Sequence, residues 1–587
     1  MFKLIKNFKK KDWLLIIVSI ALIVMQVWLE LKMPDYMSKV TVLVQTEGSK
    51  MSEILKNGGF MLLCAFGSLV GAVIVGYLIA LLASGFSRNL RSKLFRKVED
   101  MSMSEIKEFS PNSLITRTTN DITQVEMFIG FGLQLLIKAP VTAVWAITKI
   151  LNKSWEWSMV TAVAVVVLLV VIGILTIIVM PKFKIVQKLT DKLNGVTREN
   201  LTGIRVVRAF NAEEYQQEKF QDVNNSLTNL QLFNQKTMSI MAPVMYLVMY
   251  MLTLVIYFIG AYLIKDALMA DKIGLFGDMV VFSSYAMQII MSFLMLAMIF
   301  MILPRAQVSA SRINEVLDTS VSVIDGNVET KSEVGTIEFK NVSFKYPDAE
   351  EYVLKNISFK ANKGDTVAFI GSTGSGKSTL VNLIVRFYDV TDGKILIDGV
   401  NIKDYKLEYL YKLIGYVPQR AVLFNGTVNS NISYGEAMEK ISDKKIVEAS
   451  KVAQADEFIS KMDDGYESHI AQGGTNISGG QKQRIAISRA IAKNPEIYIF
   501  DDSFSALDYK TDAVLRSELK KYTKDATSLI VAQRIGTIMN ADKIIVLDNG
   551  ESVGVGTHEE LLKSCEVYKQ IALSQLSKEE LDNAKTK

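Results

Sequence analysis

The stretch with the clearest chemistry in this chain of 587 residues runs from Gly371 to Thr379 and reads G-S-T-G-S-G-K-S-T. It matches the phosphate-loop pattern G-x-x-x-x-G-K-[ST] without a mismatch. In that pattern glycines let backbone N–H groups curl around phosphate oxygens, the lysine reaches the β- and γ-phosphates, and the hydroxyl after it binds Mg²⁺. Lys377 and Ser378 take these last two positions. The residues expected to bind a nucleoside triphosphate are Gly371, Ser372, Thr373, Gly374, Ser375, Gly376, Lys377, Ser378 and Thr379.

The residues on either side of this motif predict the elements that hold it. The apolar run 365–370 predicts a buried strand, and 380–387 predicts a helix that follows the loop. A glycine-rich turn without nucleotide is the alternative, and the strand, loop and helix in this order favour the phosphate loop. We therefore expect the chain to bind a nucleoside triphosphate.

Two further stretches carry related chemistry. A second apolar strand, 497–500, ends at Asp501, and a carboxylate at a strand tip beside a phosphate loop holds Mg²⁺ in such enzymes. Residues 475–489 contain I-S-G-G-Q, in which a serine and paired glycines open a helix and predict a second anion-binding N-terminus. Its residues are Ser478, Gly479, Gly480 and Gln481. One domain rarely needs two phosphate sites of this kind.

Composition excludes several other kinds of chemistry. Lys and Arg number 66 and Asp and Glu 61, a net charge of +5 that is too balanced to indicate a nucleic-acid partner. Cys64 and Cys565 suggest neither a disulfide framework nor a metal site. His469 and His558 are the only histidines, so histidine chemistry has little place here.

Apolar residues are concentrated in the first half of the chain and predict a membrane domain. Each apolar segment reaches the roughly 20 residues that cross a bilayer core. The segments lie at about 13–31, 59–83, 128–151, 157–180, 238–264 and 276–303. The first is too long for a signal-peptide core and lacks a small-residue cleavage site, so we interpret it as an anchor.

Lysine and arginine in the connections predict the orientation. They are more frequent in three connections that we place inside, 1–12, 85–127 and 182–237, than in 34–57, 152–154 and 265–275. The outward connections are shorter, so part of this bias is length. Six spans then return the chain to the cytoplasm, where ATP is.

The long inward connections predict helices that continue out of the membrane. In residues 90–98 apolar side chains recur at three and four positions. Each connection reaches a short segment, 110–117 in the first and 201–210 in the second. Taken alone, either segment is an ordinary amphipathic piece.

Some residues within the spans stand out. Lys138 either faces a cavity or a partner, or reaches the membrane surface with its long side chain, and the sequence leaves both open. Methionines recur at helical spacing in the last span, which favours packing or lipid contact over a polyspecific substrate path. They are Met287, Met291, Met295 and Met298.

From about residue 335 the composition becomes that of a soluble α/β domain. The predicted fold is therefore multi-domain: an all-α polytopic membrane domain with six transmembrane helices, followed by an α/β P-loop ATPase domain. The expected boundaries are 1–304 for the membrane domain, 305–334 for a linker, 335–575 for the ATP-binding domain and 576–587 for a polar tail.

At these residues the second half resembles the ABC transporter ATPase domain. With six preceding spans the chain resembles a half-transporter of the bacterial multidrug exporter type, over residues 1 to about 575. The resemblance implies that two chains pair head to tail in the cytoplasmic membrane. Residues Ser478 to Gln481 of one chain would then close on ATP and Mg²⁺ held by the phosphate loop of the other.

The same resemblance implies further roles. Tyr346 would stack on adenine, Gln419 would approach Mg²⁺ and sense the membrane domain, and residues 505–508 would link the two ATP sites. Segments 110–117 and 201–210 would dock on the ATPase as coupling segments.

Two positions depart from the family pattern. After Asp501 the family normally has a glutamate that polarises the attacking water, and this chain has Asp502. Where the family has a histidine that holds the γ-phosphate, this chain has Gln533. Aspartate is one C–C bond of about 1.5 Å shorter, and a 1 Å misplacement can cost about 10²-fold in rate. Both changes predict impaired hydrolysis with binding retained, although Asp502 could still act through a water molecule.

The chain thus resembles the degenerate-site subunit of a heterodimeric exporter that moves amphipathic or hydrophobic compounds. Its partner would be a different half-transporter that supplies the glutamate and histidine, and membrane lipid would surround both. Three alternatives remain open: a homodimeric lipid or peptide exporter, an importer on the same fold, and a regulatory ATP-binding subunit.

Overall fold

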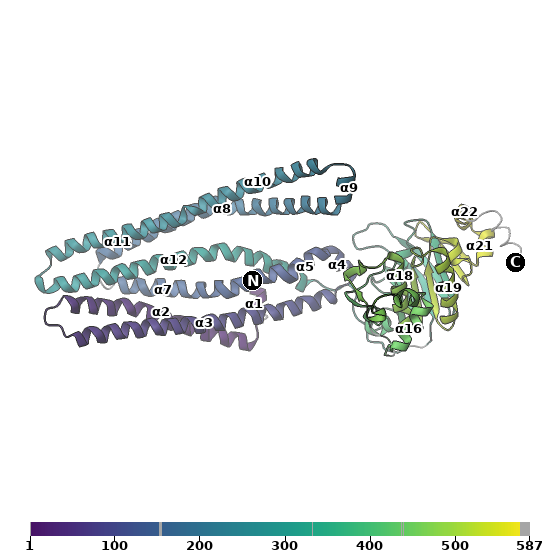
Figure 1. The fold of residues 1–587 in the computed structure, drawn as a ribbon, viewed down its shortest axis with the longest axis horizontal. Helices are drawn as coiled ribbons and strands as arrows, with labels where there is room; N and C mark the ends of the chain where they lie inside the picture. The colour runs from purple at the N-terminus through teal and green to yellow at the C-terminus, as the bar shows by residue number, and fades with distance from the viewer. Residues whose placement is uncertain are drawn as a thin grey trace. The chain divides into compact units, whose positions relative to one another are not determined.

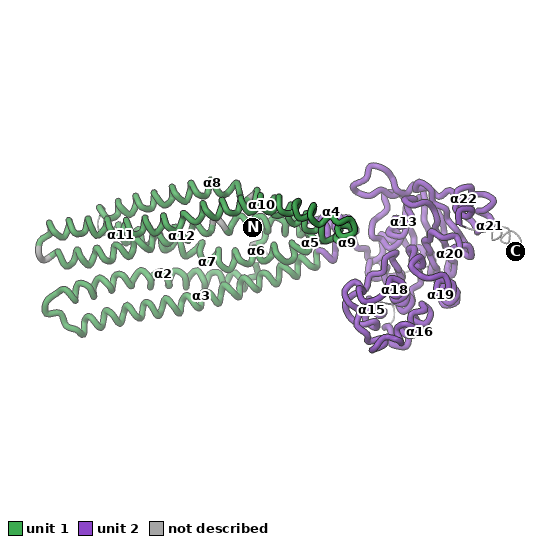
Figure 2. Tube along the Cα trace, turned by 45° about the horizontal axis from the view of Figure 1, so that its top comes forward, with its two compact units in different colours: residues 1–97, 112–318 green, residues 98–111, 319–587 purple. Residues whose placement is uncertain are grey.

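The computed structural model describes residues 2–6, 8–151, 155–330, 333–435, 437 and 440–575. The predicted polar tail 576–587 and the predicted outward connection 152–154 lie outside these residues. The chain forms two compact units, one of residues 1–97 and 112–318 and one of residues 98–111 and 319–587, which Figure 2 shows in green and purple.

The first unit confirms the six predicted spans. Six helical runs are long and apolar enough to cross a membrane, and each contains one of the predicted segments. They are α2 (Lys10–Gln45), α3 (Met51–Glu99), a run from α5 (Pro111–Thr116) through α6 (Ile122–Met127) to α7 (Leu133–Leu151), α8 (Trp155–Thr202), a run of α10 (Glu213–Ser239) with α11 (Met241–Asp266), and α12 (Met269–Asp318). The helices are longer than the apolar segments because polar helical turns continue beyond them, as the periodicity of residues 90–98 predicts.

One buried core joins these helices. α7 packs along α12 and α2, and α8 packs along α10 and α11 (Figure 1). The core takes side chains from every span, among them Ile23, Ile79, Ala146, Trp157, Ile256 and Phe282. Large apolar side chains such as Phe66, Ile177 and Phe258 remain exposed on the unit. An apolar exterior around an apolar core is what a bilayer requires of a helical bundle.

The end of the last helix differs from the predicted domain boundary. Residues 305–334 break the apolar run and are expected to form a linker, whereas α12 continues as helix through Asp318. Small and apolar residues still recur at helical spacing on one face of this polar segment, and Ala306, Ala310 and Ile313 are buried. An amphipathic helix outside the bilayer therefore follows the span, and the connecting segment begins only after residue 318.

The second unit is the predicted α/β domain. Its main sheet has the strand order β12-β11-β3-β10-β9-β6, all parallel except for β12. These strands are β3 (Thr366–Gly371), β6 (Ile414–Val417), β9 (Ile497–Asp501), β10 (Thr527–Val531), β11 (Lys543–Asp548) and β12 (Glu551–Gly556). An antiparallel sheet of order β2-β1-β4-β5 is formed by β1 (Ile337–Phe344), β2 (Leu354–Ala361), β4 (Asp392–Ile397) and β5 (Val400–Asn401).

Successive residues of β3 face two different cores. Ala368 and Ile370 belong to a cluster that also contains residues of α18 (Gly479–Lys493) and α19 (Tyr509–Tyr522). Val367 and Phe369 belong to a second cluster, with residues of α13 (Lys377–Ile384) and of the antiparallel sheet. Figure 1 shows α18 and α19 beside the sheet. A sheet covered on both faces explains why its strands are continuous apolar runs in the sequence.

Candidate ATP-binding site

The phosphate loop joins β3 to α13, so the predicted order of strand, loop and helix is confirmed. Gly374 and Gly376 have φ angles of +86° and +97°, which side chains rarely tolerate. A Cβ on Gly371 would collide with the carbonyl of Leu547, and one on Gly376 would lie 2.6 Å from Cδ2 of Leu354. Glycine is therefore required at these positions by the backbone itself.

Lys377 lies against the loop that it follows. Its Nζ donates to the carbonyl oxygens of Gly371 at 3.0 Å and Ser372 at 2.7 Å. Burial lowers the pKa of Lys377, and the charges of Asp502 and Asp501 oppose that effect. The ammonium group thus lies within the curve of the loop, where the pattern requires it.

The sheet brings the other predicted residues to the same edge. β10 lies between β3 and β9, and β6 lies beyond β9, all in parallel. Because the carboxyl ends of parallel strands meet at one edge, the residues that follow these strands converge. One cavity of about 290 Å³ is lined by Val353, Thr373, Gly374, Gly376, Lys377, Ser378, Thr379, Gln419, Asp501, Asp502, Val531 and Gln533.

Asp501 is the most buried charged residue of this edge, with 6% of its surface exposed. Burial and the neighbouring Asp502 raise the pKa of Asp501, while a hydrogen bond with Ser378 and the charge of Lys377 act in the opposite direction. The oxygens of Asp501, Ser378 and Gln419 are the hard ligands that Mg²⁺ prefers. The donor set at this edge therefore fits Mg²⁺ together with a triphosphate.

Two amide side chains that lie far from Asp502 in the sequence donate hydrogen bonds to its carboxylate. The Nε2 atoms of Gln419 and Gln533 both donate to its Oδ2, at 3.2 Å and 3.0 Å. Asp502 also has a φ of +46°, in the left-handed region where aspartate is enriched among non-glycine residues. Burial raises the pKa of Asp502, and the bond from Gln419 and the charge of Arg534 lower it.

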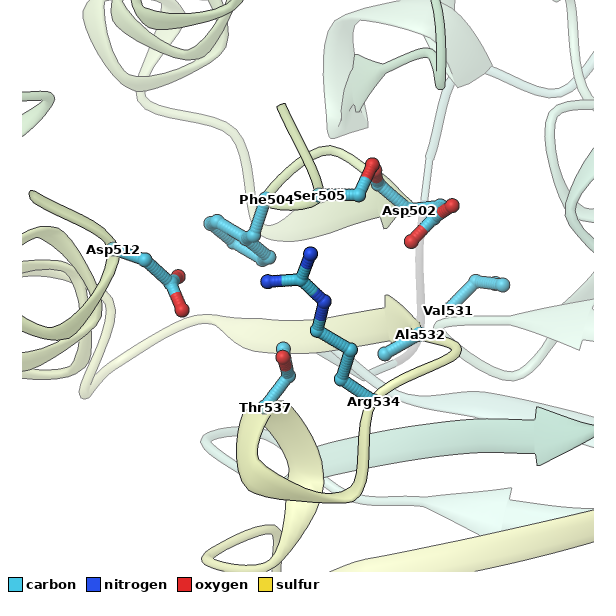
Figure 3. Close-up of a pocket in the computed structure, with 8 residues that line it drawn as sticks. All are labelled: Asp502, Phe504, Ser505, Asp512, Val531, Ala532, Arg534 and Thr537. Carbon is cyan, nitrogen blue, oxygen red and sulfur yellow. The ribbon is translucent and has the colours of Figure 1, made fainter. Parts of the chain in front are cut away.

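Arg534 supplies a cation beside this position. Figure 3 shows its side chain extending between Asp502 and Asp512 in a small pocket. The other residues that line the pocket are Phe504, Ser505, Val531, Ala532 and Thr537. Sequence reasoning considered only position 533 and missed Arg534, whose positive charge lowers the pKa of Asp502.

Tyr346 lies next to the phosphate-loop helix. Its hydroxyl is 3.0 Å from Oγ1 of Thr379, and its ring meets those of Phe344 and Tyr388 edge-on. The predicted stacking on adenine stays a prediction. Sequence reasoning missed Lys107, whose Nζ is 5.6 Å from the centre of the Tyr346 ring.

Lys107 belongs to α4 (Met103–Phe109), which lies in the same unit as the ATPase residues. Its Nζ also bonds Asp348 at 2.9 Å, and this bond raises the pKa of Lys107. The first predicted coupling segment begins at residue 110, after α4. Lys107, which lies beside Tyr346, therefore precedes this segment. Nothing in the sequence pointed to Lys107, because its partner Asp348 lies 241 positions further along the chain.

The second predicted phosphate element forms the start of α18. Ser478 caps this helix: its Oγ accepts from the backbone N–H of Gln481 at 3.3 Å, and its own N–H donates to Oε1 of Gln481 at 2.9 Å. A Cβ on Gly479 would meet nothing within 4 Å. Among the described residues, those that line the Lys377 cavity include none from this helix start. The two predicted phosphate elements therefore do not share this cavity.

Comparison with known proteins agrees with both units. Residues 13–293 match the family model of the ABC transporter transmembrane region, and residues 354–505 match that of the ABC transporter. The fold is similar to a solved structure of a bacterial Atm1-family ABC exporter with ATP bound, with a TM-score of 0.81 and 24% identity over 97% of this chain and 100% of that one.

Similar sequences span most of the chain. An uncharacterized ABC transporter ATP-binding protein of Mycobacterium tuberculosis is 40% identical over 88% of this chain and 87% of its own length. The protein YfiB of Bacillus subtilis, described in the same terms, is 36% identical over 87% and 88%. The ATP-dependent lipid A-core flippase of Pseudomonas aeruginosa is 33% identical over 84% and 80%.

These matches identify the class that the fold and site define, an ATP-hydrolysing transporter of the membrane. The chain belongs to the ABC transporter family, as an exporter half-transporter in which a multi-pass membrane domain precedes the ATPase domain. ABC exporters of this kind work as dimers.

Proposed function

We propose that this chain is the subunit with a degenerate ATP site in a heterodimeric exporter of amphipathic or hydrophobic compounds. The observation that carries the proposal is the pair Asp502 and Gln533, which replaces the glutamate and histidine of the family at the edge of an otherwise complete cavity. The phosphate loop, Tyr346 and Asp501 would bind ATP and Mg²⁺. Asp502 and Gln533 would turn the nucleotide over slowly.

Each chain would contribute to both ATP sites. Ser478 to Gln481 start a helix whose N–H groups and dipole favour phosphate, and they lie apart from the cavity of their own chain. We propose that these residues close on ATP held by the partner, which supplies a working glutamate and histidine. The intact capping of α18 supports this role.

Nucleotide binding would then shift the membrane domain between two states. ATP that binds the closed ATPase pair better than the open one favours the closed pair. Segments 110–117 and 201–210 would transmit that closure to the spans, and hydrolysis at the partner's site would reset it. In this arrangement the chain's ends lie in the bacterial cytoplasm, which the distribution of lysine and arginine supports.

A homodimeric lipid exporter is the second candidate. It is favoured by the 33% identity with the protein named ATP-dependent lipid A-core flippase. A regulatory subunit is favoured by Asp502 and Gln533, but the complete signature at Ser478 argues against it.

Purification of the chain from its native membrane distinguishes these candidates. Protein mass spectrometry is expected to find a second half-transporter in equal amount, with glutamate and histidine at the positions that match Asp502 and Gln533. A preparation that contains this chain alone would overturn the heterodimer. Accumulation of a fluorescent amphiphile in inside-out vesicles tests export, and accumulation only in right-side-out vesicles would indicate import.

A further inference from the structure

Among the described residues two ion pairs join α2 to α7, and they differ in how fully their carboxylate oxygens are bonded. In the first pair, Nζ of Lys138 on α7 lies 2.9 Å from Oε1 of Glu30 on α2. Both side chains are mostly buried, with exposed fractions of 18% and 23%. Charges within a membrane are costly and mark functional positions. Of the two readings that the sequence leaves open for Lys138, the structure thus supports the one in which it faces a partner.

The first pair has donors and acceptors that form no hydrogen bond within the described residues. Oε1 of Glu30 accepts from Lys138, from Nε2 of Gln26 at 2.9 Å and from the hydroxyl of Ser68 at 3.1 Å. Among the described residues none donates to Oε2 of Glu30, and Lys138 uses one of its three N–H groups.

Two buried atoms beside this pair also lack partners. Gln26 lies one turn before Glu30 and is 4% exposed, and its Oε1 has no hydrogen-bond partner among the described residues. Thr142 lies one turn after Lys138 and is 8% exposed. Its Oγ1 also has no hydrogen-bond partner among the described residues. Buried polar groups without a partner cost free energy, so a polar ligand that reached these two atoms would be stabilised by them.

The second pair differs at its carboxylate, since Lys149, like Lys138, has one hydrogen bond among the described residues. Oδ2 of Asp35 lies 2.7 Å from Nζ of Lys149, and its Oδ1 accepts from the hydroxyl of Tyr285 at 2.6 Å. That hydroxyl also lies 2.9 Å from the carbonyl oxygen of Leu31. Both carboxylate oxygens are therefore bonded within the chain, as expected of a pair that fastens helices together.

We propose that Glu30, Lys138 and Gln26 form the binding site for the polar head of the transported amphiphile. Because the pair has no net charge and offers both donors and acceptors, it selects heads that are zwitterionic or dipolar over heads with a net charge. This inference rests on the proposed export of amphiphiles and names the head-group class of the cargo.

The test uses the assembled transporter in nanodiscs without ATP. Binding is measured for dodecyl chains that carry a phosphocholine, a trimethylammonium or a phosphate head, below their micelle concentrations. The wild type is expected to bind the phosphocholine best. Glu30→Gln leaves a net positive site and is expected to shift the preference toward phosphate by about tenfold, whereas Lys138→Met is expected to shift it toward trimethylammonium by a similar factor.

The second ion pair supplies matched controls. Asp35→Asn and Lys149→Met make the same changes of charge on that pair, and they are expected to leave the order of the three heads unchanged. Equal shifts in these controls, or no opposite shifts in Glu30→Gln and Lys138→Met, would overturn the site.

If the single variants do not assemble, the neutral double variant Glu30→Gln with Lys138→Met provides the answer. It is expected to lose the preference for phosphocholine over dodecanol, and retention of that preference would overturn the proposal. Binding without ATP reports on the site alone. Absence of ATP-driven uptake with normal head-group selection would instead count against the proposed transport.

Discussion

The phosphate loop after β3 and the residues after β9 and β10 occupy the same edge of one sheet, yet they differ in completeness. The loop has every glycine that its backbone requires, and Lys377 lies within its curve. At the neighbouring strand ends are Asp502 and Gln533, where the family resemblance implies a glutamate and a histidine. Under the proposed function, different residues of this edge serve binding and hydrolysis, so one can be lost while the other is kept.

The hydrogen bonds of Asp502 offer a physical explanation of this difference. Its Oδ2 already accepts from Gln419 and Gln533, at 3.2 Å and 3.0 Å. We expect a carboxylate that is one methylene shorter than that of glutamate, and that two amides hold, to orient a water molecule at the γ-phosphate poorly. Variants of these residues are therefore expected to separate binding from turnover.

Gly479→Asp is expected to lower the ATP turnover of the assembled transporter by about 10²- to 10³-fold, the range for losing a preorganised transition-state donor. The added carboxylate would face the partner's triphosphate. It fits sterically, because a Cβ there meets nothing within 4 Å, and an acidic residue at a helix N-terminus does not harm the helix. Steady-state phosphate release measures this effect. Gly479→Asn is the neutral control, and equal turnover in both variants would show that charge at α18 is irrelevant.

Restoring the family residues should act in the opposite direction. Asp502→Glu combined with Gln533→His is expected to raise single-turnover hydrolysis at this chain's site by up to about 10²-fold, the cost of a 1 Å misplacement. ATP affinity should remain nearly constant, because the phosphate loop is untouched. To measure hydrolysis at this chain's site alone, the proposed catalytic glutamate of the partner is replaced by glutamine. An unchanged rate would mean that this site is not catalytically damaged.

Lys377→Met tests the binding half of the comparison. Loss of its charge-assisted bonds, worth about 1.5–3 kcal/mol, should weaken ATP binding at this site by about 10- to 100-fold. Labelled ATP under non-hydrolysing conditions measures the change, and turnover at the partner's site should persist. Lys363→Met, on an exposed lysine, is the control. Normal binding in Lys377→Met would contradict the phosphate-loop assignment.

The smallest expected effect is on pH dependence. Because burial and Asp502 raise the pKa of Asp501, that carboxylate becomes protonated at a higher pH than an ordinary aspartate when the pH falls. Mg²⁺-dependent ATP binding should therefore decline by a few fold on acidification. The decline should begin at a higher pH than the titration of a free aspartate, whose pKa is about 4. Asp502→Asn removes the neighbouring charge and should move the midpoint of the decline to lower pH. Binding curves at several pH values measure this midpoint, and an upward shift would contradict the coupling.

Much of this site could be predicted from the sequence because its parts are local. A strand, a glycine loop and a helix follow one another within residues 365–387, and Asp501 stands at the tip of an apolar run. The same holds for the six spans, which depend on the length of apolar segments alone.

Side-chain partners across elements could not be predicted, because they depend on how helices and strands pack. Lys138 stands out in the sequence, yet its partner Glu30 lies 108 residues away. The two amides that hold Asp502 come 83 residues before it and 31 after it. The sequence did not predict that α12 continues to Asp318, because the segment after residue 304 is mostly polar and its apolar face is narrow.

Steady-state ATP hydrolysis by this chain alone, purified in lipid, tests the central claim most directly. We predict a rate near the background of the Lys377→Met variant, with bound ATP still detectable in the wild type. Vigorous turnover by the isolated chain, abolished by Lys377→Met, would show that Asp502 and Gln533 suffice for catalysis and would contradict the degenerate-site account.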